Sequence, residues 1–433
     1  MLVNQVYEIV NEATSEILGS EAVAGADLTK VIDIGKTIIS SGEQQDTERY
    51  VQKLVDKVGK VVFVNRPYAG MAPKILMEGW QYGSILQKID AGISDAEAND
   101  HWQLVAGQSY DQDKYTPPSD VRQKFWNRRT TFQVPISISS DLLESAFTSA
   151  EQLNGFLSMI QTKIETTLTI KRDALIMFTI GNFIAGTLYN EHEDGNYGDG
   201  SGIRAINLLY LYNQAKGTSL TQAKCLTDME FLKFASYTIA MTSKHLIPAN
   251  TQYNIGGRVR HTPKDRQKII LLDSFAEAAN FYLQSDTFNN EFVKLPTAET
   301  VPYWQAPGVN GYAFSDVSAI HYNTYKPTAD LSASSPATVD VTADGILGVI
   351  FDEEALGVMC EKRKVTQHYN GRADFFNYWH KEFAGYFNDF DENGVVFYVA
   401  DPTAEQTLVQ TADPAGGAAQ VNVTRARNTL VKN

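Results

Sequence analysis

The longest regular pattern of apolar and polar positions runs from Thr148 to about Thr187 and contains no proline. Its apolar residues recur at steps of three, four or seven, which places them on one face of a helix. These positions are Leu153, Leu157, Ile160, Ile164, Leu168, Leu175 and Phe178. Thr148 and Glu151 form a candidate capping box, and Gly186 is the candidate stop. At 1.5 Å of rise per residue, the predicted helix is roughly 55–60 Å long.

The two ends of this predicted helix differ in polarity. The first two thirds have a polar face, formed by Gln152, Lys163, Glu165, Thr169, Lys171 and Arg172. Segment 174–185 is apolar almost all round, so we expect it to be buried. The pattern therefore predicts a spine that is half exposed and half buried. A break near Lys171–Asp173 would contradict a single spine helix.

Two shorter amphipathic helices are predicted near the amino terminus, at residues 3–18 and 43–60. The apolar positions of the first are Val3, Val6, Tyr7, Val10, Ala13 and Ile17. Neither helix can bury its apolar face alone. We expect this arm to dock on another part of the chain or on another subunit.

Two strand-like runs, at 74–93 and 120–139, flank a long polar stretch. The stretch between them contains Pro117 and Pro118 and shows no helical period. This arrangement predicts an extended hairpin with a long polar tip. Loops of such length in a compact domain are usually functional or held by a partner.

A mixed region follows at 204–342, with predicted helices at 228–244 and 275–284 and a buried strand at 269–273. Candidate capping boxes open both helices and consist of Thr227 with Glu230 and Ser274 with Glu277. Strand-like apolar runs begin and end the segment that closes near Asp401. The remaining tail is expected to be poorly ordered unless a partner holds it.

Charge and cysteine content exclude several classes of protein. With 433 residues and a formal net charge of −14, the chain is unsuited to gripping nucleic acid over its whole surface. Two distant cysteines, Cys225 and Cys360, cannot form a disulfide framework or a metal cluster, which fits a reducing compartment. We expect Cys360 to lie buried in a strand. No signal peptide or membrane-spanning run is recognisable, which predicts folding in a cytoplasm.

The segment from Asp389 to Gly394 matches the first six positions of an EF-hand calcium loop. The twelfth position, however, is Ala400, where the calcium loop requires a bidentate carboxylate. An Asp/Asn/Gly cluster forms a tight turn without a metal. We therefore expect a turn rather than a calcium site.

Residues 256–268 form a dense basic run, GGRVRHTPKDRQK. A solvated loop is favoured over local contact with nucleic acid, and the run has no phosphate-binding fingerprint. The seven histidines are scattered without metal-ligand spacing. The sequence shows no catalytic constellation, and we predict no enzyme activity, cofactor or metal site.

Two segments resemble a known family. RADFFNYWHKEFAGYFNDFDENGVVFYVAD (372–401) resembles the end of many major capsid proteins of tailed bacteriophages, whose fold is named after phage Hong Kong ninety-seven. FQVPISISSDLLESAFTSAEQLNGFLSMI (132–160) is similar to the strand that returns from their extension loop into the spine helix. The order of predicted elements over residues 1–400 is similar as well.

The resemblance implies an α+β fold with a long spine helix, an extended hairpin, and peripheral and axial domains. The implied parts are an amino-terminal arm (1–65), the extension-loop hairpin (66–135), a peripheral domain (136–203 and 343–390, with the spine helix at 148–187), an axial domain (204–342 and 391–400) and a flexible tail (401–433).

The implied function is that of a major capsid protein, which self-assembles into the icosahedral head around a double-stranded DNA genome. Implied partners are other copies in pentamers and hexamers, a separate scaffolding protein, a portal and a decoration protein. The DNA would be held only loosely, no membrane would be involved, and the virion would be assembled in the host cytoplasm.

Two alternatives remain open. One is an encapsulin-like compartment shell with the same fold. The other, from a different class, is a cytosolic enzyme or a carbohydrate-binding protein that uses the aromatic residues. That class predicts a concave pocket with converging polar groups.

Aromatic and arginine side chains on the predicted hairpin are candidate contacts between subunits, because such residues often anchor interfaces. They are Trp80, Tyr82, Trp102, Phe125, Trp126, Arg128 and Arg129. Replacing Trp102 or Trp126 by alanine is expected to leave the monomer folded but to impair assembly, as measured by size-exclusion chromatography and electron microscopy. Loss of soluble, folded protein would instead assign the tryptophan to the core.

Overall fold

The computed structural model describes residues 67–77, 86–93, 96, 105–109, 121–126, 129–139, 150–198, 200–285, 298–305, 313–327, 338–373, 375–401 and 409–410. The chain divides into two units. The first unit comprises 1–69, 134–167 and 365–380, and the second comprises 70–133, 168–364 and 381–433. The predicted helices at 3–18 and 43–60 lie outside the described residues.

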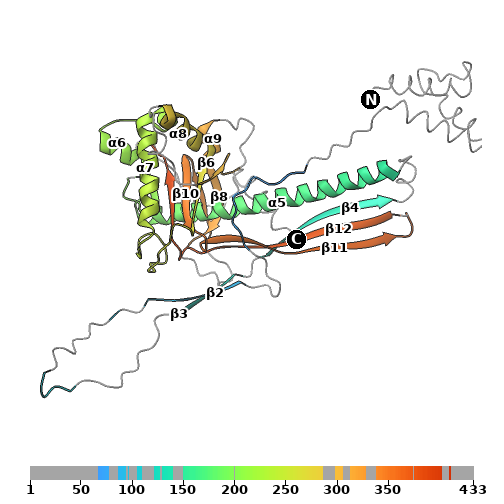
Figure 1. Ribbon diagram of the computed structural model, residues 1–433, viewed down its shortest axis with the longest axis horizontal. Helices are drawn as coiled ribbons and strands as arrows, with labels where there is room; N and C mark the ends of the chain where they lie inside the picture. The colour runs from blue at the N-terminus through green and yellow to red at the C-terminus, as the bar shows by residue number, and fades with distance from the viewer. Residues whose placement is uncertain are drawn as a thin grey trace, which may run out of the picture. The chain divides into compact units, whose positions relative to one another are not determined.

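A mixed five-stranded sheet forms the centre of the second unit (Figure 1). Its strands stand in the order β5-β13-β10-β6-β7. Their bounds are β5 Ala205–Asn207, β6 Gln267–Leu272, β7 Glu299–Val301, β10 Ile346–Asp352 and β13 Gly394–Tyr398. Every residue of β10 and β13 is buried, which explains their continuous apolar sequences. The strand predicted at 269–273 is confirmed as β6.

Helices α6 (Leu208–Lys216), α7 (Met229–His245) and α8 (Asp273–Ser285) lie together beside this sheet (Figure 1). Helix α8 packs on β6 and β7, and α7 packs on α8. The remaining elements of this part are η2 (Gln222–Thr227), α9 (Phe314–Val317), and a three-stranded sheet of β8 (Ile320–Tyr325), β9 (Thr338–Ala343) and β14 (Val409–Gln410) in the order β14-β9-β8.

Both predicted helices of this region exist, but their capping boxes were wrong. The N-cap of α7 is Asp228, whose Oδ1 accepts a hydrogen bond from the Phe231 backbone N–H at 2.8 Å. Thr227 ends the preceding 3₁₀ helix, where its hydroxyl donates to the Lys224 carbonyl. Strand β6 runs directly into α8 at Asp273, so Ser274 lies inside the helix rather than at its cap.

The long helix α5 (Ala150–Glu193) is continuous through Lys171–Asp173, which confirms a single spine helix. Thr148, the predicted cap, lies outside the described residues. Gly186 was wrongly predicted as the stop, because the helix continues to Glu193. A Cβ added at Gly186 would lie 2.5 Å from the Phe390 ring, so this glycine allows close packing instead of ending the helix.

The apolar last third of α5 is buried, as its sequence predicted. Ile180, Ile184 and Leu188 have 0% exposed surface. Phe183 stacks on Phe390 with ring centroids 5.4 Å apart and contacts Phe351 of β10 at 5.9 Å. This part of the helix is therefore joined to the central sheet by aromatic packing.

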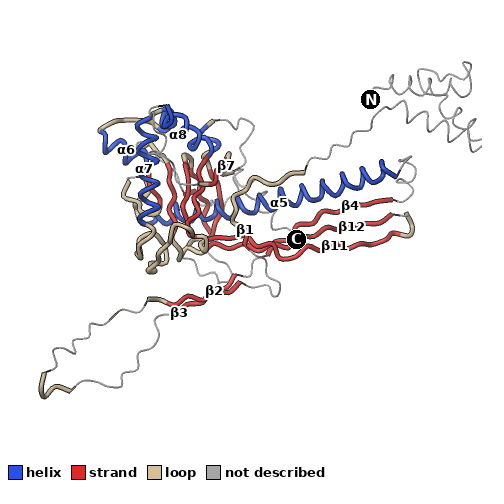
Figure 2. The backbone as a smooth tube through the Cα atoms, in the orientation of Figure 1, coloured by secondary structure: helices blue, strands red, loops and turns tan. Residues whose placement is uncertain are grey.

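A second sheet has the strand order β1-β11-β12-β4 (Figure 2). Its strands are β1 (Leu76–Met77), β4 (Arg129–Ser139), β11 (Leu356–Asn370) and β12 (Phe375–Asn388). The last three each contribute residues to both units. Within the first unit, Ser137 donates a hydrogen bond to Asn377 at 2.5 Å, and the rings of Tyr369 and Phe376 lie 4.8 Å apart.

The two predicted hairpin runs do pair. Strands β2 (Leu86–Ala91) and β3 (Val121–Trp126) are antiparallel, with Leu86 opposite Trp126 and Ala91 opposite Val121. Most of the predicted polar tip between them lies outside the described residues. Segment 343–364, which the resemblance places in the peripheral domain, belongs to the second unit, where β10 pairs with β6 and β13.

No described helix combines the length and the apolar character needed to cross a lipid bilayer.

A buried carboxylate links α5 to the second sheet inside the second unit. Glu382 of β12 accepts hydrogen bonds from Arg172 of α5 at 2.9 Å and from Arg363 of β11 at 3.0 Å. Its side chain is 1% exposed. The nearby Cys360 lies in β11 and is only partly buried, and burial raises the pKa of its thiol to about 11. This thiol is therefore protonated and weakly nucleophilic at neutral pH.

Replacing Arg172 by methionine is expected to lower the free energy of unfolding by about 3 kcal/mol, because it leaves a buried carboxylate with one fewer cation. Urea denaturation followed by circular dichroism measures this loss. Arg363→Met is the matched control and should cost less, because the Arg363 side chain is 47% exposed. Equal losses for the two variants would contradict the role given to Arg172.

Candidate functional site

The β2–β3 hairpin has its charged residues on the face that meets the rest of the second unit. Alternation along β2 places Lys88 and Asp90 on the partly buried face, while Ile89 between them is 60% exposed. In β3, Lys124 and Trp126 share the inner face, and Phe125 is 59% exposed. The hairpin is therefore partly inverted relative to an ordinary half-buried strand pair. Charged residues lie on the inner face beside Leu86 and Trp126, and Ile89 and Phe125 are exposed on the outer face.

Asp389 neutralises two lysines that stand directly opposite each other on this inner face. Lys88 and Lys124 are cross-strand partners, an arrangement that is destabilising by itself. The two oxygens of Asp389 accept from Lys88 Nζ at 2.9 Å and from Lys124 Nζ at 2.6 Å. The Asp389 side chain is 2% exposed. Burial would raise the pKa of this carboxyl, but the charges of the two lysines outweigh that effect and lower it.

The neighbouring carboxylates of the same turn complete the cluster. Glu392 lies 2.6 Å from Lys88 Nζ and 3.2 Å from Arg260, and Asp391 lies 2.7 Å from Lys124 Nζ. Burial raises the pKa of Glu392, and the cations offset this only in part. Burial likewise opposes the charge of Lys88, yet its pKa is raised, because Asp389 and Glu392 stabilise the ammonium group.

Asp90 forms a second anchor on the loop that carries the basic run. Its carboxylate accepts from Arg260 at 2.8 and 2.9 Å and from Arg258 at 2.8 Å. The hydrogen bond from Arg260 is the main cause of the lowered pKa of Asp90. The loop is held by Asn254, whose side chain bonds both the N–H and the carbonyl of Arg258. The planar guanidinium group of Arg260 makes two hydrogen bonds to this carboxylate, which fixes the orientation of the two groups as well as attracting them.

The sequence analysis favoured a solvated loop for the basic run at 256–268, and this prediction was wrong for its arginines. Arg258 is 9% exposed, and both Arg258 and Arg260 bind Asp90, 168 and 170 residues earlier in the chain. Arg266 is paired with Glu353 and Glu354. Ion pairing within the chain accounts for these cations without nucleic acid.

The tight turn predicted at 389–394 is confirmed between β12 and β13. The Asp391 N–H donates to Asp389 Oδ1 at 3.1 Å, and the Ile255 N–H donates to the Phe390 carbonyl at 2.9 Å. Asp389 and Asp391 stand at positions one and three of the calcium-loop pattern, and both carboxylates bind the ammonium group of Lys124. The turn therefore binds the hairpin through ion pairs.

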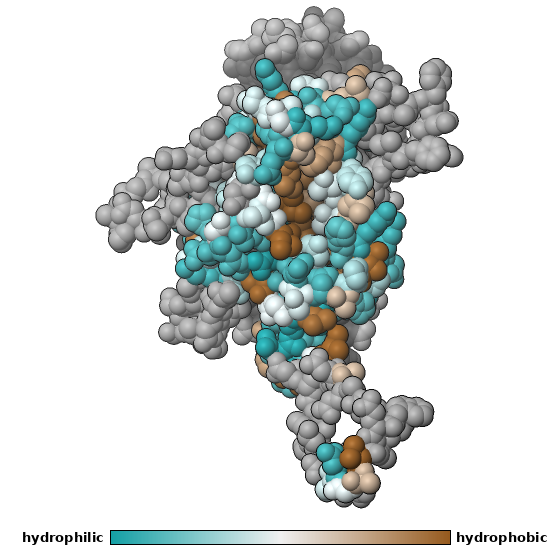
Figure 3. Space-filling view, turned by 90° about the vertical axis from the view of Figure 1, so that its left-hand side faces the viewer, coloured by the Kyte–Doolittle hydropathy of each residue, from teal (hydrophilic) through white to brown (hydrophobic). Residues whose placement is uncertain are grey.

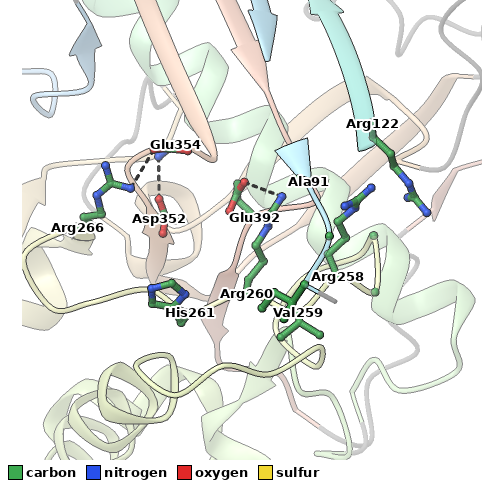
Figure 4. Close-up of a pocket in the computed structure, with 14 residues that line it drawn as sticks. Ala91, Arg122, Arg258, Val259, Arg260, His261, Arg266, Asp352, Glu354 and Glu392 are labelled. Carbon is green, nitrogen blue, oxygen red and sulfur yellow. Dashed lines mark hydrogen bonds and ion pairs between the residues drawn. The ribbon is translucent and has the colours of Figure 1, made fainter. Parts of the chain in front are cut away.

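A cavity of about 410 Å³ lies beside the cluster (Figure 4). Arg122, Arg258 and Arg260 line it together with His261 and Arg266, and Asp352, Glu354 and Glu392 supply opposite charges. Figure 4 shows Arg266 bonded to Glu354 and Arg260 to Glu392. Ion pairs between opposite charges hold the hairpin, the loop at Arg258 and Arg260, and the turn at Glu392 together. The role of these residues is therefore structural.

The predicted hairpin contacts have different positions. Phe125 is exposed on the outer face, whereas Trp126 is half-buried and lies 5.3 Å, ring centroid to centroid, from Phe387 of its own chain. Arg129 begins β4, but its side chain is not among the described parts. The other four predicted contacts, Trp80, Tyr82, Trp102 and Arg128, lie outside the described residues.

Sequence reasoning missed the charged cluster itself. The signal that was present is the strand LQKIDA, in which Lys and Asp alternate with an apolar outer residue. The three carboxylates of the 389–392 turn were the complementary signal. Neither pattern specifies its partner, because the paired residues are separated by more than 160 positions.

Comparison with known proteins assigns the chain to a family. The family model of the Phi29-like phage major capsid protein matches residues 6–398. The chain belongs to the Phi29-like phage major capsid protein family. No curated protein matches it.

Chains in several solved phage structures are similar to this capsid protein. A chain from the capsid structure of Staphylococcus phage Andhra has a TM-score of 0.50 at 10% identity, with 79% of this chain and 87% of that chain covered. A chain from the structure of the head fiber and inner core protein gp22 of bacteriophage P68 has a TM-score of 0.48 at 9% identity, with the same coverage. A chain from the capsid structure of cyanophage P-SCSP1u has a TM-score of 0.41 at 11% identity, with 79% and 91% covered.

The protein is a structural capsid subunit that assembles with its own copies and is part of the virion. The α+β capsid fold expected from the resemblance is confirmed. The encapsulin-like and enzyme or carbohydrate-binding alternatives receive no support from the family match.

Replacing Asp389 by asparagine is expected to weaken hairpin docking by about 3 kcal/mol, because two lysines then face each other without their buried anion. Amide hydrogen exchange in residues 86–91 and 121–126 measures docking. Asp391→Asn is the control and should have a smaller effect, because Asp391 pairs with Lys124 alone among the described lysines and its side chain is 16% exposed. Equal deprotection in both variants would contradict the central role of Asp389.

Acidification provides a separate test. The pKa values of Asp389 and Asp90 are lowered in the folded state, so their stabilisation is complete above the unfolded value of about 3.9 and is lost as pH falls further. The raised pKa of Glu392 acts in the opposite direction, since its protonation in the folded state favours folding as pH falls toward about 4.3. Hydrogen exchange corrected for intrinsic rates should show a docked hairpin from pH 7 to about 4 and release below. Release already near pH 6 would contradict this assignment.

Proposed function

We propose that this capsid protein forms the icosahedral head around a double-stranded DNA genome, and that its hairpin is the extension loop by which each copy lies on a neighbour. The observation that carries the proposal is the inverted β2–β3 hairpin. Its inner face is held by ion pairs within its own chain, and its outer face presents apolar side chains to the outside.

The outer face has the composition of a contact surface. Ile89, Phe125 and Val121 are 60%, 59% and 51% exposed. They lie on the same side of the two-stranded ribbon, opposite Gln123, Gln87 and Ala91 respectively. Clustered exposed apolar residues on a soluble chain mark places where another surface binds.

The charged inner face gives this contact a direction. Ion pairs at Asp90 and Asp389 hold the hairpin base on its own unit, so the outer face is presented in a defined orientation before a neighbour arrives. Less ordering is then required during association, which favours repeated binding between many copies. A shell obtains its stability from such repeated contacts.

Further contacts between copies would use exposed apolar residues outside the hairpin (Figure 3). Tyr237 of α7 and Phe281 of α8 are 65% and 70% exposed. In this proposal residues 204–342 and 391–400 form the axial domain of pentamers and hexamers, and the peripheral domain comprises 136–203 and 343–390. Segment 66–135 is the extension loop, preceded by the arm at 1–65 and followed by the tail at 401–433.

The proposed partners outside the shell are a separate scaffolding protein, a portal and a decoration protein. With a net charge of −14, the chain would hold packaged DNA only loosely. Assembly would take place in the host cytoplasm without a membrane. The proposal includes no catalytic activity and no cofactor.

Replacing Phe125 by serine is expected to leave the hairpin docked but to reduce the yield of closed shells by at least about tenfold, because a modest loss at each contact is repeated throughout the assembly. Sedimentation and negative-stain microscopy of protein expressed with its scaffolding protein measure this yield. Wild-type protein should give closed particles.

Ile203→Ser is the matched control, because Ile203 is exposed at 41% but lies outside the hairpin. Normal shell yield from Phe125→Ser would contradict the extension-loop role. Hydrogen exchange of β2 and β3 separates a lost contact from an undocked hairpin.

A further inference from the structure

The two arginines that bind Asp90 are carried by one short segment whose backbone is held at both ends. Arg260 pairs with Asn250, and each N–H donates to the carbonyl of the other residue, at 2.8 and 2.9 Å. At the other end, the side-chain amide of Asn254 bonds the N–H and the carbonyl of Arg258, at 2.8 and 2.7 Å. Figure 4 shows the Arg258 and Arg260 side chains pointing to the same side of this segment. The direction of both guanidinium groups therefore depends on how this backbone is held.

Asn254 is itself held by a buried chain of hydrogen bonds. Its Nδ2 also donates to Asn393 Oδ1 at 3.3 Å, and Asn393 Nδ2 donates to the Thr262 hydroxyl at 3.2 Å. The Thr262 hydroxyl in turn donates to Asp352 Oδ2 at 2.8 Å. All four residues are between 0% and 5% exposed. A hydrogen bond lost from this chain is therefore not replaced by one to bulk water.

Asp352 fixes the direction in which this chain of hydrogen bonds runs. An ionised carboxylate only accepts hydrogen bonds, so the Thr262 hydroxyl donates to it and accepts from Asn393. The Asn393 amide is thereby turned with its oxygen toward Asn254. The Asn254 amide is turned with its oxygen toward the Arg258 N–H. Each group in the chain consequently has one orientation that satisfies its neighbours.

The acceptor end of the chain stands on the central sheet. Asp352 ends β10, and Asn393 immediately precedes β13. The Asp352 N–H donates to the Asn393 carbonyl at 3.0 Å, and every residue of both strands is buried. A rigid strand pair therefore orients the loop, and the loop presents its arginines to the hairpin.

We infer that Asp352 is the positioning residue of the Asp90 anchor, because it orients Arg258 through the buried chain of Thr262, Asn393 and Asn254. Arginines that are oriented in advance bind the hairpin carboxylate with less loss of conformational freedom. The inference concerns docking within one copy, whereas the extension-loop proposal concerns contact between copies. The two can therefore fail separately.

Thr262→Val tests the chain in the full-length, unassembled protein. The variant removes the hydroxyl that joins Asn393 to Asp352 and keeps the branched shape of the side chain. Two buried polar groups then lack a partner, so we expect Arg258 to lose its orientation and the hairpin to undock more often. Amide hydrogen exchange in residues 86–91 and 121–126 should accelerate by about tenfold.

Two variants are the matched controls. Thr262→Ser keeps a hydroxyl that both donates and accepts, so hairpin exchange should stay within about twofold of wild type. Thr179→Val removes an equally buried hydroxyl, which donates to the Leu175 carbonyl within α5 at 2.8 Å, and should leave hairpin exchange unchanged. Urea denaturation followed by circular dichroism separates local undocking from a general loss of stability.

A double-mutant cycle tests whether the chain acts through Asp90. Asp90→Asn removes the charge that the arginines bind, so adding Thr262→Val should then change hairpin exchange by less than about twofold. A general weakening of the loop would instead accelerate exchange by about tenfold in both backgrounds. That result would overturn the inference.

Asp352→Asn tests the direction of the chain and does not depend on Thr262→Val being folded. The Glu354 N–H, which donates to Asp352 Oδ1 at 2.9 Å, would retain the amide oxygen. The amide nitrogen would then face the Thr262 hydroxyl, which loses its acceptor. Hairpin exchange should rise by about fivefold. Wild-type exchange in this variant, or equal acceleration in Thr179→Val, would contradict the role given to Asp352.

Discussion

The burial of Asp389 between two opposed lysines is the interaction on which the arrangement of this capsid protein depends. Lys88 and Lys124 would repel each other across the hairpin, and Asp389 would be costly to bury alone. Each group is acceptable only because the others are present. The hairpin, the turn after β12 and the loop at Arg260 are consequently held together by one set of matched charges.

The charged cluster around Asp389 is held in place because the turn at 389–394 packs on the spine helix α5. Phe390, inside the turn, stacks on Phe183 and packs over Gly186 of α5. The same helix contacts the central sheet through Phe351 and the second sheet through the Arg172–Glu382 pair. Aromatic packing thus fixes the position of the carboxylates, and the carboxylates fix the position of the hairpin. A buried charge pair gives orientation more reliably than it gives stability.

In the proposed function the two faces of the hairpin have different roles. The charged inner face would set the direction of the hairpin, and the exposed apolar residues of the outer face would supply contact area for a neighbour. An acidic chain with its arginines committed to internal carboxylates also leaves little cationic surface at this site for DNA. In the proposed function, the residues that hold the hairpin would therefore also reduce attraction to packaged DNA.

Local patterns determined much of the fold. The 3.6-residue period of α5, the alternation of the hairpin strands and the Asp/Asn/Gly turn each depend on neighbours within a few positions, so each can be seen in the sequence. Segments 372–401 and 132–160 carried the family resemblance for the same reason. The cap of α7 was misplaced by one residue because Thr227 and Asp228 are adjacent polar residues that can both cap a helix.

Only the tertiary structure decided which distant residues meet. Glycine is a residue type that often ends helices, yet α5 continues past Gly186 to Glu193. The ring of Phe390, 204 positions later in the chain, packs in the space beside this glycine. The sequence around Arg258 and Arg260 predicts a solvated basic loop, whereas in the structure both arginines bind Asp90. A charge in a sequence does not specify its partner, because Coulomb attraction depends on distance in space and on burial. The sequence by itself determined the spine, the hairpin and the turn. The tertiary structure determined that matched charges join the hairpin to the turn and that aromatic packing joins the turn to the spine.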